Sequence, residues 1–499
     1  MTTSARATPA GSKDATDSPQ SQASFAAADR HAWVVFSVTS LGVLLTGLNA
    51  STLDVALPSV VRHFNASATA ATWILLSFLL VTTVLVVPFG RLADIIGRRR
   101  LYLAGLGLLT LASLVAGAAP NVAVLILARI AQAVGAASIM ANVTAILTDA
   151  FRPSKLSIGL GANVTVAAVG LVAGPAVGGV VADGLDWRWV FWFNVPIGLV
   201  SMLWAIPTLR ELPRQGAREP FDFVGAVLST IVIGAFVMAI ALGGTHGWTA
   251  WPVVAGAIAF VVGFPVLIWT QRRLPFPLLD LQLFADRSRA IAFSVTFVLA
   301  FARFGIVLIL ALYLQAAHGW SAVRTGLIIM PTAIGMMVAA PVAARLAREF
   351  SARILASAGL GISAVALFYL AAELNPRTDM TSLIVVLSVI GLGTGLVMTP
   401  NTSSIMASVT PSRRGVANAL RAMMQNVGTV TGTAVCLAIV TRPLEPRDQA
   451  AAYAGTLSRL SAHTLPAFTA GYHRAMLLLA IVTAVGAFAS LLRNPPPTN

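Results

Sequence analysis

Charged residues are scarce in this chain. Asp, Glu, Lys and Arg make up only 10% of its 499 residues, 57% are hydrophobic, and the mean hydropathy is +0.84. A soluble domain carries about 25% charged residues, and a soluble core of this size with so few charges would not stay in solution. The composition therefore excludes ordinary soluble enzymes and binding domains, and it predicts an all-α polytopic membrane protein.

Cysteine and metal-ligand patterns are nearly absent. Cys436 is the single cysteine and lies within an apolar run, which excludes a disulfide framework within one chain. The six histidines are scattered through loops and run ends, and the chain has no phosphate-binding loop. We therefore expect no metal, no cofactor and no use of ATP. A membrane sensor or a biosynthetic membrane enzyme is the alternative from another class, but no nucleophile–base pair favours it.

Acidic residues are outnumbered by basic ones. The chain has 33 Lys and Arg against 18 Asp and Glu, a formal net charge of +15, which in a soluble protein would suggest a nucleic-acid partner. Here the basic residues lie in short loops between apolar runs and concentrate in every second loop, for example 90–100 and 272–289. The positive-inside rule then predicts a multi-pass protein of the cell membrane with both termini cytoplasmic. We expect a monomer whose partners are the lipid bilayer, a small-molecule substrate and protons, not nucleic acid.

Long apolar runs recur along the whole chain. A bilayer is crossed by about 20 apolar residues, and we count fourteen runs of suitable length. They lie at 33–58, 70–89, 101–119, 121–147, 158–182, 189–209, 223–243, 251–270, 290–315, 325–344, 353–372, 380–407, 415–440 and 475–492.

These runs divide the chain into segments. Residues 1–32 are polar and lack the features of a cleaved signal, so we expect a disordered cytoplasmic N-tail. The further segments are an N-terminal six-helix half (33–209), a linker with two extra transmembrane helices (210–289), a C-terminal six-helix half (290–492) with a long external loop (441–474), and a cytoplasmic tail (493–499).

One charged turn separates the second and third runs. It reads GRLADIIGRRR from Gly90 to Arg100, between two uncharged stretches. Residues 90–105 align with 344–359, where Arg345-Leu346-Ala347 matches Arg91-Leu92-Ala93 and Arg348 stands in place of Asp94. This internal repeat predicts two related halves.

Three further segments have distinctive patterns. Arg129 and Gln132 lie in a Leu-Ala-Arg-Ile-Ala-Gln stretch, a glycine-rich run follows at 170–179, and Trp-Arg-Trp-Val-Phe-Trp-Phe-Asn-Val-Pro-Ile-Gly occupies 187–198. With the charged turn, these segments resemble the major facilitator superfamily, and within it the fourteen-span drug:proton antiporter branch of multidrug and quaternary-ammonium exporters. The resemblance implies the major facilitator fold, with two six-helix halves facing a central cavity and two extra central helices, fourteen transmembrane helices in all.

The resemblance also implies roles for two of these motifs. The charged turn corresponds to a conformational latch formed by Gly90, Asp94, Gly97 and Arg98. The glycine-rich run corresponds to the antiporter motif, with Gly170, Gly174, Pro175, Gly178 and Gly179. The alternatives are a simple topogenic turn for the first motif and close helix packing for the second.

Ionisable residues inside membrane spans are costly and therefore mark functional sites. Four lie well inside the predicted spans, away from their ends: Asp54, Arg129, Arg303 and Arg421. We expect Asp54 to couple transport to protons, since it is the only acidic residue of these spans. The resemblance implies that Arg129 takes part in this coupling by organising the proton or substrate path. The candidate substrate cavity comprises Ser51, Gln132, Arg303, Asn418, Arg421 and Gln425. The alternatives are a helix-end position for Asp54, a structural ion pair for Arg129, and snorkelling to the interface for Arg303 and Arg421.

The first run departs from the family pattern. The family places an acid at the position of Asn49 and an amide at that of Asp54, so the two have exchanged places. Five residues along a helix rotate a side chain by about 140°, so Asp54 cannot simply replace an acid at position 49.

Two functions are compatible with these patterns. The first is a secondary active transporter that exports small amphipathic drugs or biocides in exchange for protons. The second is an exporter of an endogenous, anionic metabolite or antibiotic, which three intramembrane arginines against one aspartate favour.

Overall fold

The computed structural model describes residues 19–210, 222–274, 277–347, 349–373, 379–409, 414–453 and 464–493. These residues are helical, apart from turns and short connections. Thirteen of the described helices are long and apolar enough to cross a membrane, and α5 (Pro153–Gly184), with 32 residues, also has spanning length. The all-α polytopic architecture expected from the sequence is confirmed.

The helices fall into two halves with a pair between them in the sequence. The first half comprises α1 (Pro19–Phe64), α2 (Ala68–Ile96), α3 (Arg98–Gly117), α4 (Val122–Ala150), α5, and α6 (Trp189–Trp192) with α7 (Asn194–Thr208), which share one predicted span. The pair is α8 (Phe223–His246) and α9 (Trp251–Arg273), followed by the short 3-10 helix η1 (Leu281–Phe284). The second half comprises α10 (Arg287–His318), α11 (Ala322–Leu346), α12 (Ala352–Glu373), α13 (Met380–Ala407), α14 (Arg414–Thr441), α15 (Pro446–Tyr453) and α16 (Thr464–Leu491).

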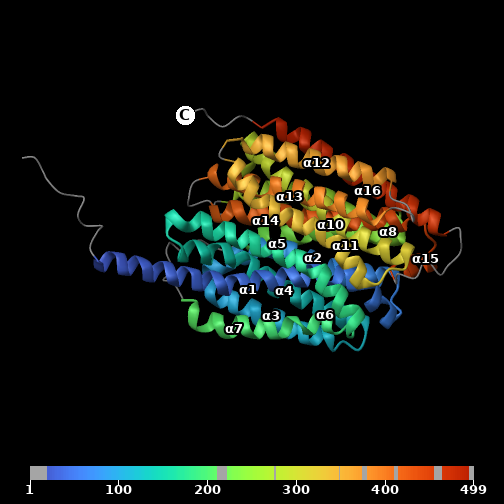
Figure 1. Ribbon diagram of the computed structural model, residues 1–499, viewed down its shortest axis with the longest axis horizontal. Coiled ribbons are helices and arrows are strands. Elements are labelled where there is room, and N and C mark those ends of the chain that lie inside the picture. Colours follow the sequence, from blue (N-terminus) through green and yellow to red (C-terminus); the bar gives the residue numbers. More distant parts are fainter. Residues whose placement is uncertain are drawn as a thin grey trace, which may run out of the picture.

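The long helices lie side by side along the long axis of the molecule (Figure 1). α1 begins and α16 ends at the same end of this bundle, which we call the terminal end. α6 and α15 lie at the opposite end, which we call the far end. A chain that crosses the membrane an even number of times begins and ends on the same side, as α1 and α16 do here.

The two halves have matching internal packing. α1 packs on α5 and α2 on α4 in the first half, while α10 packs on α14 and α11 on α13 in the second. The halves meet along two seams, α5 against α11 and α2 against α14. Each seam joins the second spanning helix of one half to the fifth of the other, so the seams are related by the internal repeat. The turns α2–α3 and α11–α12 hold the two copies of the repeated segment.

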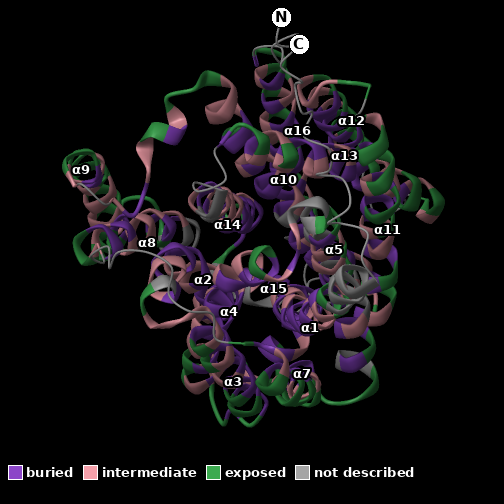
Figure 2. Cartoon of the chain, turned by 90° about the vertical axis from the view of Figure 1, so that its left-hand side faces the viewer, coloured by how far each residue is buried: buried purple, intermediate pink, exposed green. Residues whose placement is uncertain are grey.

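The extra pair is central only in the sequence. α8 packs against α2 and α14 at one seam, and α9 packs on α8 at the outer edge of the molecule (Figure 2). The pair therefore extends the bundle sideways from the α2–α14 seam.

A hydrogen-bond network around Asp222 and Gln271 connects the start of α8 to the end of α9. Asp222 accepts hydrogen bonds from the Gly225 backbone N–H (2.6 Å), from Gln271 Nε2 (2.7 Å) and from the Leu278 backbone N–H (3.1 Å). Gln271 Oε1 in turn accepts from the Leu279 backbone N–H at 2.7 Å. Charge-assisted bonds of this kind are strong, so the start of α8, the end of α9 and the following segment are held together.

Two predicted segments have different bounds in the structure. The N-tail was expected to be disordered over 1–32, but α1 begins at Pro19, and residues 1–18 lie outside the described part of the chain. Alanine-rich sequence favours helix here, and a 2.6 Å ion pair from Asp29 to Lys155 holds the segment against the start of α5. With 46 residues, α1 is about 69 Å long, so it extends well past the hydrocarbon region at the terminal end.

The predicted external loop 441–474 is also largely helical. α14 continues to Thr441, α15 spans Pro446–Tyr453 and α16 already begins at Thr464, while residues 454–463 lie outside the described part. The tail expected at 493–499 is described only at Arg493. Polar residues such as His473 and Arg474 hid the start of α16 from a search for uncharged runs.

Candidate functional site

A buried polar cluster in the first half is centred on Arg129 of α4. Its Nη1 donates to Asn49 Oδ1 at 2.5 Å and to Gln132 Oε1 at 3.1 Å, and its Nε donates to the Ile74 carbonyl at 3.3 Å. The guanidinium also lies over the Phe78 ring, 4.3 Å from its centre. Arg129 is therefore buried with its charge spread over neutral acceptors of α1, α2 and α4 and one aromatic face.

Gln132 completes this cluster. It is fully buried, and its Nε2 donates to Ser113 Oγ of α3 at 2.8 Å. The amide thus holds Arg129 in place, which is a positioning role. The sequence analysis placed Gln132 and Ser51 in the candidate substrate cavity. Neither residue lines the cavity in the C-terminal half that is described below.

Asp54 lies in α1 beside this cluster. Its side chain is 9% exposed, and it is close enough to Arg129 for the two charges to attract each other. Asn49, one and a half turns earlier on α1, forms the direct hydrogen bond to Arg129. The exchange of acid and amide noted in the sequence therefore has a structural meaning: the amide holds the guanidinium, and the carboxylate interacts with it through space.

A second polar site lies in the C-terminal half, between α10, α13 and α14. We call it the C-half cavity. The space open to water-sized groups is about 20 Å³, room for about one water molecule. Its polar lining consists of Thr296, Arg303, Asn401, Thr402, Arg421 and Gln425. The structure thus brings together Arg303, Arg421 and Gln425, three of the residues that the sequence analysis proposed.

Arg421 is held along its own helix. Its Nη1 donates to Gln425 Oε1 at 2.9 Å and its Nε to Asn418 Oδ1 at 3.2 Å. Asn418 Nδ2 donates in turn to Thr144 Oγ1 of α4 at 3.0 Å, so it links the two halves near the terminal end. Asn418 therefore supports Arg421 from outside the cavity lining.

Sequence reasoning missed Arg493, which follows α16. Its side chain is 4% exposed, and its Nη2 donates to Oδ1 of Asn401, a residue of the C-half cavity. Nε and Nη1 of Arg493 are buried and have no hydrogen-bond partner. Burial lowers the pKa of Arg493 to about 10, so the group stays charged at neutral pH. The sequence analysis assigned Arg493 to the cytoplasmic tail because it lies just beyond the last predicted span, and it therefore was not considered as a site residue.

Hydrogen bonds join the two halves near both ends of the bundle. Near the far end, Gln315 Nε2 of α10 donates to the Val55 carbonyl of α1 at 3.0 Å, and Tyr453 of α15 shares a 3.0 Å hydrogen bond with Thr72 of α2. Near the terminal end, Asn418 contacts Thr144. The two halves are therefore joined by hydrogen bonds at both ends of the bundle.

The glycine-rich motif forms the contact between α5 and α1. A side chain at Gly174 would overlap Ser51, and one at Gly178 would overlap the Thr52 carbonyl. Gly170 approaches the Leu44 carbonyl, and Gly179 faces the Ala322 carbonyl at the start of α11. The motif thus serves both the packing of the first half and one seam. The Pro175 side chain lies outside the described part.

The charged turn joins α2 to α3. Gly97 caps α2 with a φ of 106°, a conformation that L side chains rarely adopt. Arg98 Nη1 forms a 2.6 Å ion pair with Asp149 at the end of α4, and an added side chain at Gly90 would meet nothing within 4 Å. The Asp94 side chain lies outside the described part, so its latch role stays a prediction.

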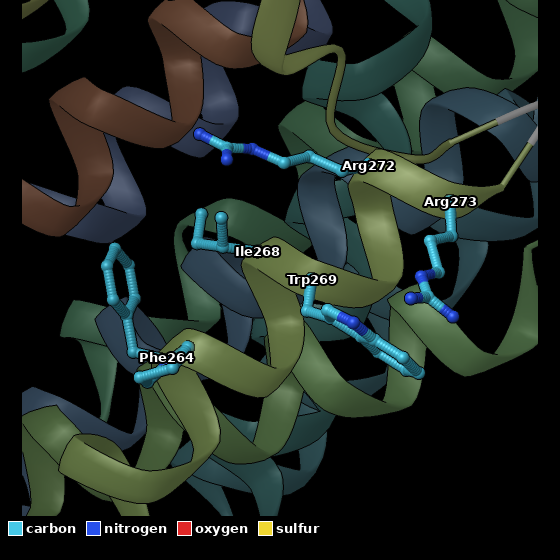
Figure 3. A pocket seen from close by; sticks show the side chains of 6 residues that line it. Phe264, Ile268, Trp269, Arg272 and Arg273 are labelled. Carbon is cyan, nitrogen blue, oxygen red and sulfur yellow. The ribbon is translucent and has the colours of Figure 1, made fainter.

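Another hollow, of about 550 Å³, lies apart from these sites. It lies on α9 and is lined by Phe264, Pro265, Ile268, Trp269, Arg272 and Arg273 (Figure 3). The Arg273 guanidinium stacks over the Trp269 ring at 4.3 Å. Aromatic and arginine side chains at a helix end are typical of a membrane–water interface, so this hollow belongs to the surface that faces lipid.

Comparison with known proteins gives consistent results. The family model described as Major Facilitator Superfamily matches residues 39–433 and, in a second overlapping match, 292–499. The multidrug resistance protein Stp of Mycobacterium tuberculosis is 32% identical over 398 residues, which cover 80% of this chain and 74% of Stp. The riboflavin transporter RibZ of Clostridioides difficile is 27% identical over 402 residues, 81% of this chain and 87% of RibZ.

A solved structure shows the same fold. The crystal structure of a bacterial homologue of the human lysosomal transporter Spinster, in an inward-facing and unoccupied conformation, superposes with a TM-score of 0.61 at 16% identity. The match covers 93% of this chain and 97% of the other.

Proposed function

Because this chain belongs to the major facilitator superfamily of membrane transporters, we propose that it exports small amphipathic drugs or biocides in exchange for protons. The observation that carries the proposal is the buried Asp54 beside the Arg129 cluster. Asp54 is the only acidic residue of the predicted spans, and a proton-coupled carrier needs a group that gains and loses a proton within the membrane.

The geometry offers a way to couple protonation to movement. A proton on Asp54 removes its negative charge and therefore its attraction for Arg129. Arg129 is bonded to Asn49 of α1 and to the Ile74 carbonyl of α2. A change in the Asp54–Arg129 interaction would therefore affect the packing of α1, α2 and α4 around Arg129. α1 and α2 also carry the far-end contacts to the other half, so protonation would bias the closure of that end.

The export of drugs rests on similarity. The relative Stp is named as a multidrug resistance protein, and the glycine-rich motif of α5 resembles that of antiporters. The relative RibZ is named as a riboflavin transporter, which supports the second candidate, an endogenous or anionic cargo. The arginines of the C-half cavity favour this second candidate as well.

The proposal is tested by substrate-induced proton release. Proteoliposomes with an imposed pH gradient are loaded with a pH-sensitive dye, and release is recorded on addition of rhodamine 6G or fluorescein. Asp54→Asn is expected to abolish proton release and the dependence of dye movement on the gradient, because the amide cannot load a proton. Dye binding to the purified variant should persist.

Asp186→Asn is the matched control. It makes the same chemical change in a loop, where the Asp186 side chain is 52% exposed and paired with Arg188. This variant should behave as wild type. Undiminished proton release from Asp54→Asn vesicles would place coupling elsewhere.

A further inference from the structure

The C-half cavity has an unusual charge for a site within a membrane. Arg303 of α10 and Arg421 of α14 line one small space, and no acidic residue occurs among the described residues of its lining. The hydrogen bonds of Arg421 go to the amide oxygens of Gln425 and Asn418, which are neutral. Both arginines therefore line the same space, and the described part of its lining contains no acidic residue.

A third guanidinium adjoins this space. Arg493 donates to Asn401, which lines the cavity and donates through Nδ2 to Thr296 Oγ1 at 3.0 Å. Two buried N–H donors of Arg493 lack acceptors. A buried donor without a partner is costly, so these donors favour a state of the protein in which an acceptor is supplied.

The described residues around Arg493 do not supply that acceptor. The nearest charged neighbour with a printed contact is Arg353 at the start of α12, whose Nη1 donates to the Arg493 carbonyl at 3.3 Å. Arg353 also has a buried Nε without a partner. This end of the second half thus accumulates positive charge and unfilled donors.

We propose that the C-half cavity binds an oxyanion group, such as a carboxylate, of an amphipathic cargo. The inference rests on the proposed transport function and defines the charge of what is carried. Guanidinium groups match carboxylates through parallel hydrogen bonds, so an anionic group complements the positive lining and the unfilled donors of Arg493. A cationic cargo would meet like charge in the same lining. The cavity must widen to admit the group, because the present space of about 20 Å³ holds about one water.

The test uses two dyes with the same xanthene ring system and opposite charge: fluorescein, an anion above neutral pH, and rhodamine 6G, a cation. Binding of each to the purified protein in detergent is measured by fluorescence anisotropy. Wild type should bind fluorescein saturably, and Arg303→Gln or Arg421→Gln should weaken that binding at least tenfold. Arg421→Lys should recover part of the loss, because an ammonium retains the charge but not the planar fork.

Arg324→Gln is the matched control. Arg324 lies at the start of α11 near the far end, where it stacks over the Trp320 ring at 4.2 Å and is remote from the cavity lining. This variant should bind fluorescein as wild type does. Rhodamine 6G binding should be unchanged or stronger in the cavity variants, and thermal unfolding midpoints should confirm that all variants are folded.

The outcomes separate the two proposals. Absent fluorescein binding, equal weakening of both dyes, or no effect of the arginine changes would overturn the anion site. Displacement of fluorescein by inorganic phosphate alone would assign the cavity to a free ion and overturn its role in binding cargo. Arginine-dependent fluorescein binding without movement under a pH gradient would leave the anion site standing and reject proton-coupled export.

Discussion

At the residue scale, Asn49 and Asp54 interact with Arg129 in different ways. Both lie on α1, yet only Asn49 forms a hydrogen bond to Arg129. A carboxylate at position 49 would form a direct ion pair with the guanidinium, which would hold the acid in its charged form. An amide there leaves Arg129 anchored regardless of protonation. Asp54 attracts Arg129 without a direct bond, and for this reason we propose Asp54 as the proton-binding group.

The charged turn gives a prediction at the same scale. Asp94→Asn should leave the protein folded and inserted but lower transport at least tenfold, because the lost charge would bias the equilibrium between the two facing states. Dye efflux from cells that express the variant at wild-type levels measures this.

Asp149→Asn separates this role from the visible ion pair. Asp149 accepts from Arg98 within the same half, and both side chains are about a third exposed, so the pair is expected to contribute little. If Asp149→Asn stops efflux while Asp94→Asn does not, the latch lies in the Arg98–Asp149 pair.

At the element scale, α5 shows how a glycine-rich motif works. Gly174 and Gly178 bring α5 onto α1, and Gly179 on a neighbouring face meets the start of α11. One helix therefore packs both within its own half and against the other half at the α5–α11 seam. Small residues permit this because no side chain separates the backbones.

Gly178→Ala tests this contact. The new methyl group would overlap the Thr52 carbonyl, and backbone cannot give way as a flexible side chain can. Overpacking of this kind costs about 1–3 kcal/mol, so the thermal unfolding midpoint in detergent should fall and transport should be impaired.

Gly161→Ala provides the control on the same helix. A methyl group there would meet nothing within 4 Å, and alanine favours helix over glycine. Its unfolding midpoint should equal or exceed that of wild type. Equal effects of the two substitutions would show that helix propensity, not the α1–α5 contact, decides the result.

At the scale of the whole molecule, the two halves meet along two seams and are joined by hydrogen bonds at both ends. The seams α5–α11 and α2–α14 correspond to each other under the internal repeat, but α8 packs only at the α2–α14 seam. α15 adds a contact that the repeat does not contain: Tyr453 is fully buried against the first half at the far end. Opening of that end requires this contact to break, so α15 biases the molecule toward closure there.

Topology is the prediction at this scale. Cys436 is fully buried, so the wild-type protein should not react with a membrane-impermeant maleimide. A cysteine at Ser351 should be labelled only after permeabilisation, and one at Glu445 in intact cells, because α12, α13 and α14 separate the two positions and arginine-rich loops face the cytoplasm. Labelling of both positions from one side would contradict the three crossings between them.

Much of this architecture follows from the sequence alone. Uncharged runs of bilayer length determine where helices cross, since backbone groups in lipid must be satisfied within the helix. The repeat at 90–105 and 344–359 indicated two halves, and the in-span ionisable residues indicated where to look for a site. Ends such as Pro19 and Thr464 were missed because polar residues can be helical beyond the membrane, where hydropathy carries no information.

Only the tertiary structure decided which polar residues act together. Spacing along a helix places Arg421 and Gln425 on one face, but it cannot show that Arg303 lines the same cavity, or that Arg493 reaches Asn401 from beyond the last span. It also could not show that Asn49 rather than Asp54 bonds to Arg129. These contacts join residues on different helices, and their geometry depends on how the helices pack, which no local pattern encodes.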